Sequence, residues 1–177
     1  MRGINFLVPR NMTKAAGFYN SIMQTDEPAF IIEPLNAYRV KEKMPTNLGE
    51  YCYEFGKIEI LKEGKDISII SYGSTLNLVI DSIPEFDDLG IDVDVIDIQT
   101  LIPFDIGKEI LLSVRKTNRV IIIDEDVPGG ASSYILHKLI DEQGIFNYLD
   151  SSPKTLTAKD HRPCLLYTSD AADDNAG

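Results

Sequence analysis

Short apolar runs, each about as long as one buried strand, alternate along this chain with segments of helical period. The run at residues 120–123 (Val-Ile-Ile-Ile) is the most strongly β-branched, and it predicts a central strand. Strands separated by helices are joined by right-handed crossovers, which place helices on both faces of a parallel sheet. The sequence therefore predicts an α/β domain built on a mainly parallel sheet.

Local signals set the expected ends of these elements. Asn11 can cap a helix, Pro84 is expected to stop one because proline cannot continue it, and Ser132 or the serine after it can cap the last. The alternation at residues 57–61 favours an edge strand, and the aspartates within residues 93–98 favour a strand with one wetter face. Strands are predicted at residues 4–8, 29–32, 57–61, 67–71, 93–98, 120–123 and 155–157, and helices at 13–24, 75–83, 106–117 and 132–142, with one further turn at 146–149.

The chain changes character at two places. Residues 34–55 are polar, contain Pro45 and Gly49 and keep no period, which is typical of a linker. Residues 164–177 (CLLYTSDAADDNAG) resemble the translation of a transposon-type sequencing adaptor, so they are excluded from the fold. An adaptor at that point means that the gene was cut there, and Met1 stands just before a predicted strand, so we expect a piece of a longer protein.

The formal net charge of −11 argues against two classes of partner. Nothing in so acidic a chain would neutralise nucleic-acid phosphates, and no basic helix is available for a membrane surface. No apolar run approaches the ~18 residues of a membrane span. The two cysteines, Cys52 and Cys164, lie far apart, so the sequence predicts neither a zinc site nor a disulfide framework. We expect an acidic protein of the reducing cytoplasm.

Two histidines are the first candidates for acid–base chemistry, because their pKa lies near neutrality. His137 falls inside a predicted helix, where packing is the simpler interpretation. His161 stands in a loop beside Arg162 and Pro163, where a catalytic role is open. No motif places a serine or cysteine nucleophile near it.

Three polar stretches are the next candidates. Residues 124–126 (Asp-Glu-Asp) follow the predicted central strand, at the edge where α/β folds bind ligands. They could bind a cation or a partner's Arg or Lys, or remain a solvated charge run. The glycines of residues 128–132 precede a helix and could hold an anion or permit a tight turn. Tyr38 and Arg39 could grip a carboxylate or a neighbouring subunit, or lie on a solvated surface.

Four blocks of this sequence belong together: INFLVPRNMTKAAGFYNSIMQTDEPAFIIEPLNAYR, GKIEILKEGKDISIISYG, VIDIQTLIPFD and NRVIIIDEDVPGGASSYI. In their order and spacing they resemble the beta subunits of thiamine-diphosphate-dependent 2-oxoacid dehydrogenases. The positions that carry the resemblance are Lys14, Gly17, Pro28, Glu33, Tyr38, Arg39, Asp97, Thr100, Leu101, Pro103, Asp105, Arg119, Glu125, Asp126, Gly129 and Gly130.

The resemblance implies a division of the chain. Residues 1–34 would end a pyrimidine-binding domain as a strand–helix–strand remnant, and residues 35–56 would be a linker. Residues 57–163 would form a transketolase-type C-terminal domain. That domain is a three-layer α/β/α sandwich whose mainly parallel sheet has an antiparallel edge strand.

The resemblance also implies a function. The family enzyme binds thiamine diphosphate and magnesium between subunits, decarboxylates a 2-oxoacid and passes the acyl group to lipoyl on a dihydrolipoyl acyltransferase core. The expected partners are an alpha subunit or alpha half, a second beta subunit and that core, with this piece serving assembly and docking. The pattern IIEP followed by Tyr-Arg leans towards a branched-chain 2-oxoacid over pyruvate.

The family's catalytic residues fall outside this sequence. Its activating glutamate and catalytic histidine would lie upstream of Met1, and its diphosphate loop lies on the alpha subunit. The chain is therefore expected to hold no catalytic or thiamine-binding residue and to be inactive alone. One family site, a structural potassium ion, corresponds to Ile22, Thr25 and Glu27, where the family usually has Asp and Asn at the last two positions. Helix capping is the simpler interpretation of these residues.

Two other functions remain open. The domain is shared with transketolase and deoxyxylulose-phosphate synthase, which differ in their upstream motifs. A free-standing, non-catalytic assembly or binding module is the alternative from another class.

Overall fold

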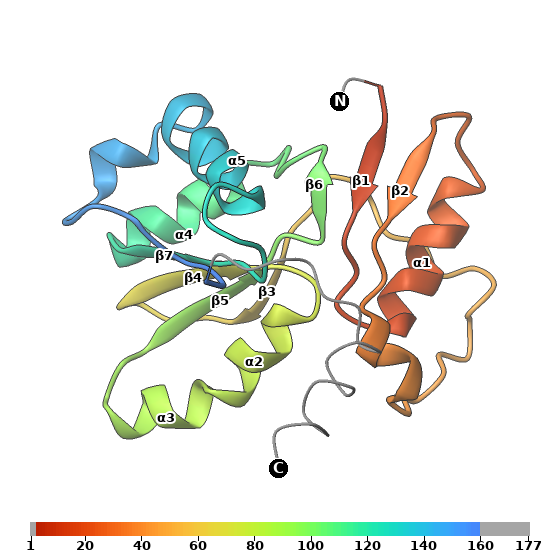
Figure 1. Ribbon diagram of the computed structural model, residues 1–177, viewed down its shortest axis with the longest axis horizontal. Coiled ribbons are helices and arrows are strands. Elements are labelled where there is room, and N and C mark those ends of the chain that lie inside the picture. Colours follow the sequence, from red (N-terminus) through yellow and green to blue (C-terminus); the bar gives the residue numbers. More distant parts are fainter. Residues whose placement is uncertain (1–2, 160–177) are drawn as a thin grey trace, which may run out of the picture.

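The computed structural model describes residues 3–159, in which five strands form one sheet, here called the large sheet (Figure 1). Its order is β3-β5-β4-β7-β8, and only β3 runs antiparallel to its neighbour. This confirms a mainly parallel sheet with an antiparallel edge strand. The strands are β3 (Glu59–Lys62), β5 (Val93–Asp97), β4 (Ile67–Ser71), β7 (Val120–Ile123) and β8 (Lys154–Leu156).

Helices cover both faces of the large sheet, which gives the predicted three layers (Figure 1). Helices α2 (Thr75–Asp81) and α3 (Ile83–Asp88) pack on one face around Ile69 and Val95. Helices α4 (Glu109–Thr117) and α5 (Ala131–His137) pack on the other around Ile70, Ile96 and Ile122, and α5 continues as a π-helical segment, η2 (Lys138–Glu142). Successive strand residues point to opposite faces, so apolar runs such as residues 69–70 supply both cores at once.

Strand β1 (Asn5–Leu7) is the middle of a second sheet within the described residues, here called the small sheet. It pairs in parallel with β2 (Ala29–Ile31) and antiparallel with β6 (Thr100–Ile102). Helix α1 (Met12–Ile22) covers one face, where Leu7 and Phe18 are fully buried. The predicted cap is confirmed, because the Asn11 side chain accepts a hydrogen bond from the Lys14 amide at 2.9 Å.

Several sequence predictions at the ends of elements were wrong, and each error has a local cause. Pro84 was expected to stop a helix, but it lies in the first turn of α3, where its missing N–H needs no hydrogen-bond partner. Helix α4 starts at Glu109 because Asp105 accepts from its amide at 2.9 Å. Ser132 is not the cap of α5: its amide donates to Asp124 at 2.7 Å. The aspartate-bearing strand β5 has no wet face, since all five of its residues are buried.

Two short elements were not predicted from the sequence, and a third was predicted only as a turn. Strand β6 was missing from the prediction, although it completes the small sheet. A 3-10 helix, η1 (Leu35–Arg39), lies in the predicted linker, and η3 (Ile145–Tyr148) corresponds to the predicted turn at 146–149. The central strand predicted at residues 120–123 is confirmed, because β7 is an interior strand that pairs with β4 and with β8.

Candidate functional site

The order of the large sheet creates one topological switch point. From β4 the chain passes through α2 and α3 to β5, and α4 then carries it back across β4 to β7. These two crossovers lie on opposite faces, so the loops that follow β4 and β7 diverge at the carboxyl edge. Ligands of open α/β sheets bind in such a crevice. Here the loops supply Tyr72 and Ser74 after β4 and residues 124–126 after β7.

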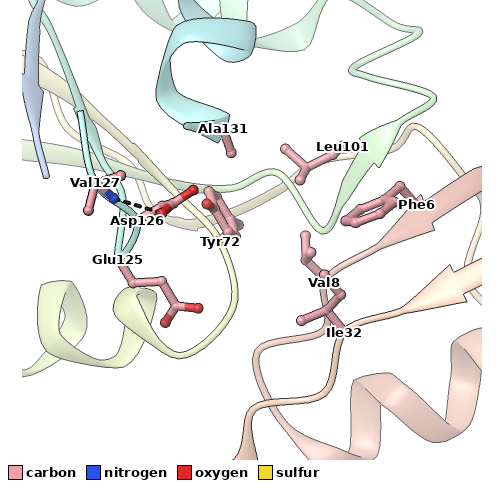
Figure 2. A pocket seen from close by; sticks show the side chains of 9 residues that line it. All are labelled: Phe6, Val8, Ile32, Tyr72, Leu101, Glu125, Asp126, Val127 and Ala131. Carbon is pink, nitrogen blue, oxygen red and sulfur yellow. Dashed lines mark hydrogen bonds between the residues drawn. The ribbon is translucent and has the colours of Figure 1, made fainter. Parts of the chain in front are cut away.

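A cleft of about 850 Å³ opens at this point, and we call it the switch-point cleft (Figure 2). Its two walls come from different parts of the fold, one from the small sheet and one from the loop after β7. The small sheet contributes apolar side chains, and the loop contributes carboxylates. The lining residues are Phe6, Val8, Ile32, Tyr72, Leu101, Glu125, Asp126, Val127 and Ala131.

Asp124 is buried behind the acidic wall and has a structural role. Its carboxylate accepts hydrogen bonds from the Tyr72 hydroxyl, from the Ser132 amide at 2.7 Å and from the Asp126 amide at 3.0 Å. Burial, this hydrogen bond and the nearby carboxylates raise the pKa of Tyr72 above its ordinary value, so the phenol remains a donor. The anion at the start of α5 is therefore the protein's own, which favours the tight-turn interpretation of the glycines at residues 129–130 over an anion site.

Glu125 and Asp126 are exposed, and each carboxylate accepts one hydrogen bond within residues 3–159. Glu125 accepts from the Ser74 hydroxyl at 2.6 Å, and Asp126 accepts from the amide of Val127 at 2.8 Å. Neither carboxylate forms an ion pair with any residue between 3 and 159. The run of three acidic residues thus divides into one buried structural carboxylate and two that face the cleft.

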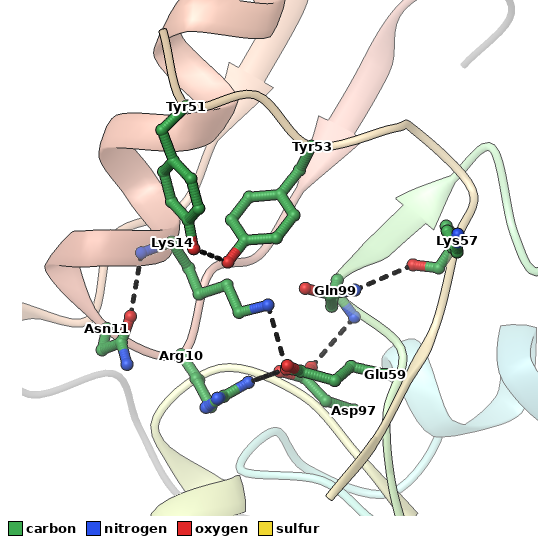
Figure 3. Close-up of polar contacts among 9 residues, drawn as sticks. All are labelled: Arg10, Asn11, Lys14, Tyr51, Tyr53, Lys57, Glu59, Asp97 and Gln99. Carbon is green, nitrogen blue, oxygen red and sulfur yellow. Dashed lines mark hydrogen bonds and ion pairs between the residues drawn. The ribbon is translucent and has the colours of Figure 1, made fainter. Parts of the chain in front are cut away.

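A second group of charged residues, here called the junction cluster, joins the small sheet to the large one (Figure 3). Arg10, in the loop before α1, donates to Asp97 at the end of β5 at 2.9 Å and also to Glu59 on β3. Lys14, on α1, lies 2.9 Å from the same Glu59 carboxylate and 3.8 Å from the centre of the Tyr53 ring. Two cations and two carboxylates therefore alternate across the junction.

Burial sets the electrostatics of the junction cluster. The Asp97 side chain is fully buried, and desolvation raises its pKa to about 6 against the opposing effect of Arg10. Burial acts in the same direction on Glu59, but the hydrogen bonds from Arg10 and Lys14 outweigh it and hold the pKa of Glu59 below its ordinary value. A clamp of this kind fixes position, because removing one partner would leave a buried charge unpaired.

Gln99 follows Asp97 with a left-handed backbone, at φ 55°. Its side-chain Nε2 donates to the Lys57 carbonyl at 3.1 Å, while its side-chain oxygen is buried and has no hydrogen-bond partner among the described residues. Lys14 and Asp97 were predicted only as family positions, and Arg10 and Glu59 were not predicted. Asp97 could have indicated the cluster, since a carboxylate on a strand flanked by apolar strands needs a partner.

The other predicted residues do not gather into a site. His137 is exposed and lies 2.7 Å from Asp141 on its own helix segment. Tyr38 donates to Glu33, and Arg39 is exposed beside it. His161 and residues 164–177 lie outside the described residues. Within residues 3–159, no three His, Cys, Asp or Glu side chains are grouped so that they could hold a metal ion, and no helix is long and apolar enough to cross a bilayer.

The residues predicted to hold potassium lie at the end of α1. The Ile22 carbonyl accepts from the Thr25 amide at 3.0 Å and from the Thr25 hydroxyl at 3.2 Å. Glu27 is exposed and accepts from Asn5 at 3.0 Å. The contacts between Ile22 and Thr25 are helix capping, the contact of Glu27 joins the segment after α1 to β1, and the potassium site stays a prediction.

Comparisons with known proteins bear on the whole chain. A family model described as "Transketolase, C-terminal domain" matches residues 56–166. The beta subunit of acetoin:2,6-dichlorophenolindophenol oxidoreductase from Bacillus subtilis is 31% identical over 91% of this chain and 46% of its own length. The mitochondrial beta subunit of 2-oxoisovalerate dehydrogenase from Chaetomium thermophilum is 34% identical over 70% of this chain and 26% of its own.

Two further matches agree with these. The beta subunit of the pyruvate dehydrogenase E1 component from Bacillus subtilis is 33% identical over 70% of this chain and 37% of its own length. A solved structure titled "Split gene transketolase, inactive beta4 tetramer" has a TM-score of 0.67 at 22% identity, covering 89% of this chain and 49% of that one, which shows the fold alone. The chain spans about half the length, or less, of the curated relatives named above.

Proposed function

The chain belongs to the family of transketolase C-terminal domains, and on that premise we propose that it is part of a 2-oxoacid dehydrogenase beta subunit. In the complete enzyme this subunit would contribute to the oxidative decarboxylation of a branched-chain 2-oxoacid or pyruvate. The observation that carries the proposal is the 31% identical match, which covers 91% of this chain. The likeness to transketolase is at a lower identity and supports only the fold.

The proposed role of this piece is structural. The junction cluster holds the small sheet against the large one through the buried Asp97, so the two sheets would present their surfaces to other subunits as one body. An alpha subunit, a second beta subunit and the acyltransferase core are the proposed partners, and the acidic surface suits a basic one. A cytoplasmic location is part of the same proposal and agrees with the low cysteine content.

Thiamine diphosphate supplies the acyl-carbanion chemistry when it is bound to enzymes of this kind. The described residues do not fit a magnesium–diphosphate site, since residues 3–159 bring no three metal-binding side chains together. We therefore assign none of them a catalytic step, and we propose that other parts of the enzyme hold this cofactor and magnesium.

The test is to express the complete coding sequence that contains this chain together with its alpha partner. Oxidative decarboxylation of 3-methyl-2-oxobutanoate and of pyruvate, and oxidative cleavage of acetoin, would each be followed by the reduction of dichlorophenolindophenol. We expect turnover of one oxoacid in the assembled enzyme and none by the 177-residue chain alone. Ketol transfer between sugar phosphates without oxoacid turnover would instead favour transketolase, and lipoyl reduction by the isolated chain would contradict the structural role.

A further inference from the structure

The small sheet turns an apolar face to the switch-point cleft (Figure 2). Its helix-covered face buries Leu7, while Phe6, Val8 and Ile32 point the other way and line the cleft. Phe30 lies beside Phe6, with ring centres 6.0 Å apart, and half of its surface is exposed. Apolar surface therefore continues from inside the cleft onto β2, and burying it against a ligand would be favourable.

The facing wall carries negative charge that nothing in the described chain neutralises. Glu125 and Asp126 each keep oxygen lone pairs free after their single hydrogen bonds to Ser74 and to the Val127 amide. Asp124 lies buried behind them and does not line the cleft, because its carboxylate accepts from Tyr72 and from two backbone amides. Among residues 3–159, no Lys, Arg or His lines the cleft.

We propose that the switch-point cleft binds an organic cation, meaning an apolar group that bears an ammonium, amidinium or guanidinium. The cationic nitrogen would donate to Glu125 and Asp126, and the apolar part would pack on Val8, Ile32 and Leu101. The volume of about 850 Å³ suits a small organic molecule or the side chain of a bound peptide segment. An apolar anion would be repelled by the same wall, and a neutral apolar ligand would leave the carboxylates unpaired.

Benzamidine is the probe, titrated into the full chain by calorimetry and by NMR, with benzyl alcohol and benzoate as neutral and anionic matches. We expect benzamidine to shift the resonances of Phe6 and Tyr72, and to bind at least about tenfold more tightly than either match. The variant pair Glu125→Gln and Asp126→Asn keeps the shape of both side chains and should weaken benzamidine at least about tenfold. Glu85→Gln, on the exposed side of α3, is the matched carboxylate control and should change nothing.

The apolar wall and the source of the cation have separate tests. Ile32→Ser, at a half-exposed position that can be changed without unfolding the core, should weaken benzamidine several-fold. If the peptide acetyl-Leu-Arg-amide binds more tightly than benzamidine, the ligand is an arginine of a polypeptide. If benzamidine binds more tightly, the ligand is a small organic cation. Equal binding of benzoate, or unchanged binding in the Glu125/Asp126 variants, would overturn the proposal. Benzamidine binding to a chain that ends at Lys159, without binding to the full chain, would also overturn the proposal, because residues 160–177 would then be the occupant.

Discussion

In the large sheet, each interior strand has a neighbour on both sides and an apolar layer on both faces, whereas the small sheet has a helix on one face only. Among residues 3–159, no strand pairs with the outer edge of β2. The large sheet draws its stability from branched aliphatic side chains that are fully buried, such as Ile70 and Ile122. The small sheet depends more on directional contacts: the junction cluster and the aromatic rings of Tyr51 and Tyr53 against α1. Packing of aliphatic side chains depends little on charge or pH, whereas the contacts of the junction cluster depend on both.

The comparison predicts its largest effect for matched truncations in the two sheets. Ile122→Ala removes a fully buried side chain from β7 and should lower the free energy of unfolding by about 2–5 kcal/mol. Ile31→Ala on β2 removes a partly exposed one and should cost about 1 kcal/mol. Urea unfolding of both variants checks the difference, and equal losses would break the comparison.

The second prediction concerns the aromatic packing on α1. Gly17→Ala would place a methyl group 2.7 Å from the Tyr53 ring and 3.0 Å from the Tyr51 ring. Both rings must then move, so we expect a loss of about 1–3 kcal/mol, seen first in the probes of the small sheet. Gly49→Ala is the control, because its new methyl group meets nothing within 4 Å, and it should stay within about 0.5 kcal/mol of the parent.

The third prediction concerns pH and the junction cluster. Because burial raises the pKa of Asp97 to about 6 in the folded chain, the folded state binds the proton more tightly than the unfolded state does. This contribution is full below the unfolded pKa of Asp97 and is lost as the pH rises through 6. As the pH rises from 4 to 6, the free energy of unfolding should therefore fall by up to about 1.4 kcal/mol per pH unit. This fall should be missing in Asp97→Asn. An identical pH profile in parent and variant would show that Asp97 titrates normally.

The smallest effect is expected for potassium at the end of α1. If Ile22, Thr25 and Glu27 bind the ion, replacing NaCl with KCl at equal ionic strength should raise stability by about 0.5–1 kcal/mol. The Thr25 hydroxyl would have to turn away from the Ile22 carbonyl, which now accepts from it. Thr25→Val removes that oxygen and should abolish the difference between the salts, whereas no difference in the parent chain would remove the site from the proposal.

The parts of the fold predicted from sequence are those set by local pattern. The apolar runs at residues 67–71 and 120–123 and the cap at Asn11 depend on neighbours in the chain, and they were located correctly. The misses depend on distant residues. Strand β6 has little apolar pattern of its own and forms only because β1 offers it an edge.

The candidate site shows the same limit. The acidic loop after β7 was placed at the ligand-binding edge because that edge follows from topology. Its division into one structural and two free carboxylates could not be predicted, since it depends on Tyr72 and on the start of α5. The aspartates of β5 were expected to face solvent because their partners are distant in the sequence. Arg10, which binds Asp97, precedes it by 87 residues.

The long separation between β1 and β6 also bears on how the chain is made. Residues 5–7 leave the ribosome well before residues 100–102, which β1 needs as its antiparallel neighbour. Until residues 100–102 have been made, α1 and β1 therefore lack a complete sheet, and chaperones have time to reach their apolar side chains. When the whole chain refolds, the strands of the large sheet pair over shorter separations, such as Ile69 with Ile121, than β1 and β6 do. We therefore expect pulse-labelled amides of β4 and β7 to gain protection before those of β1.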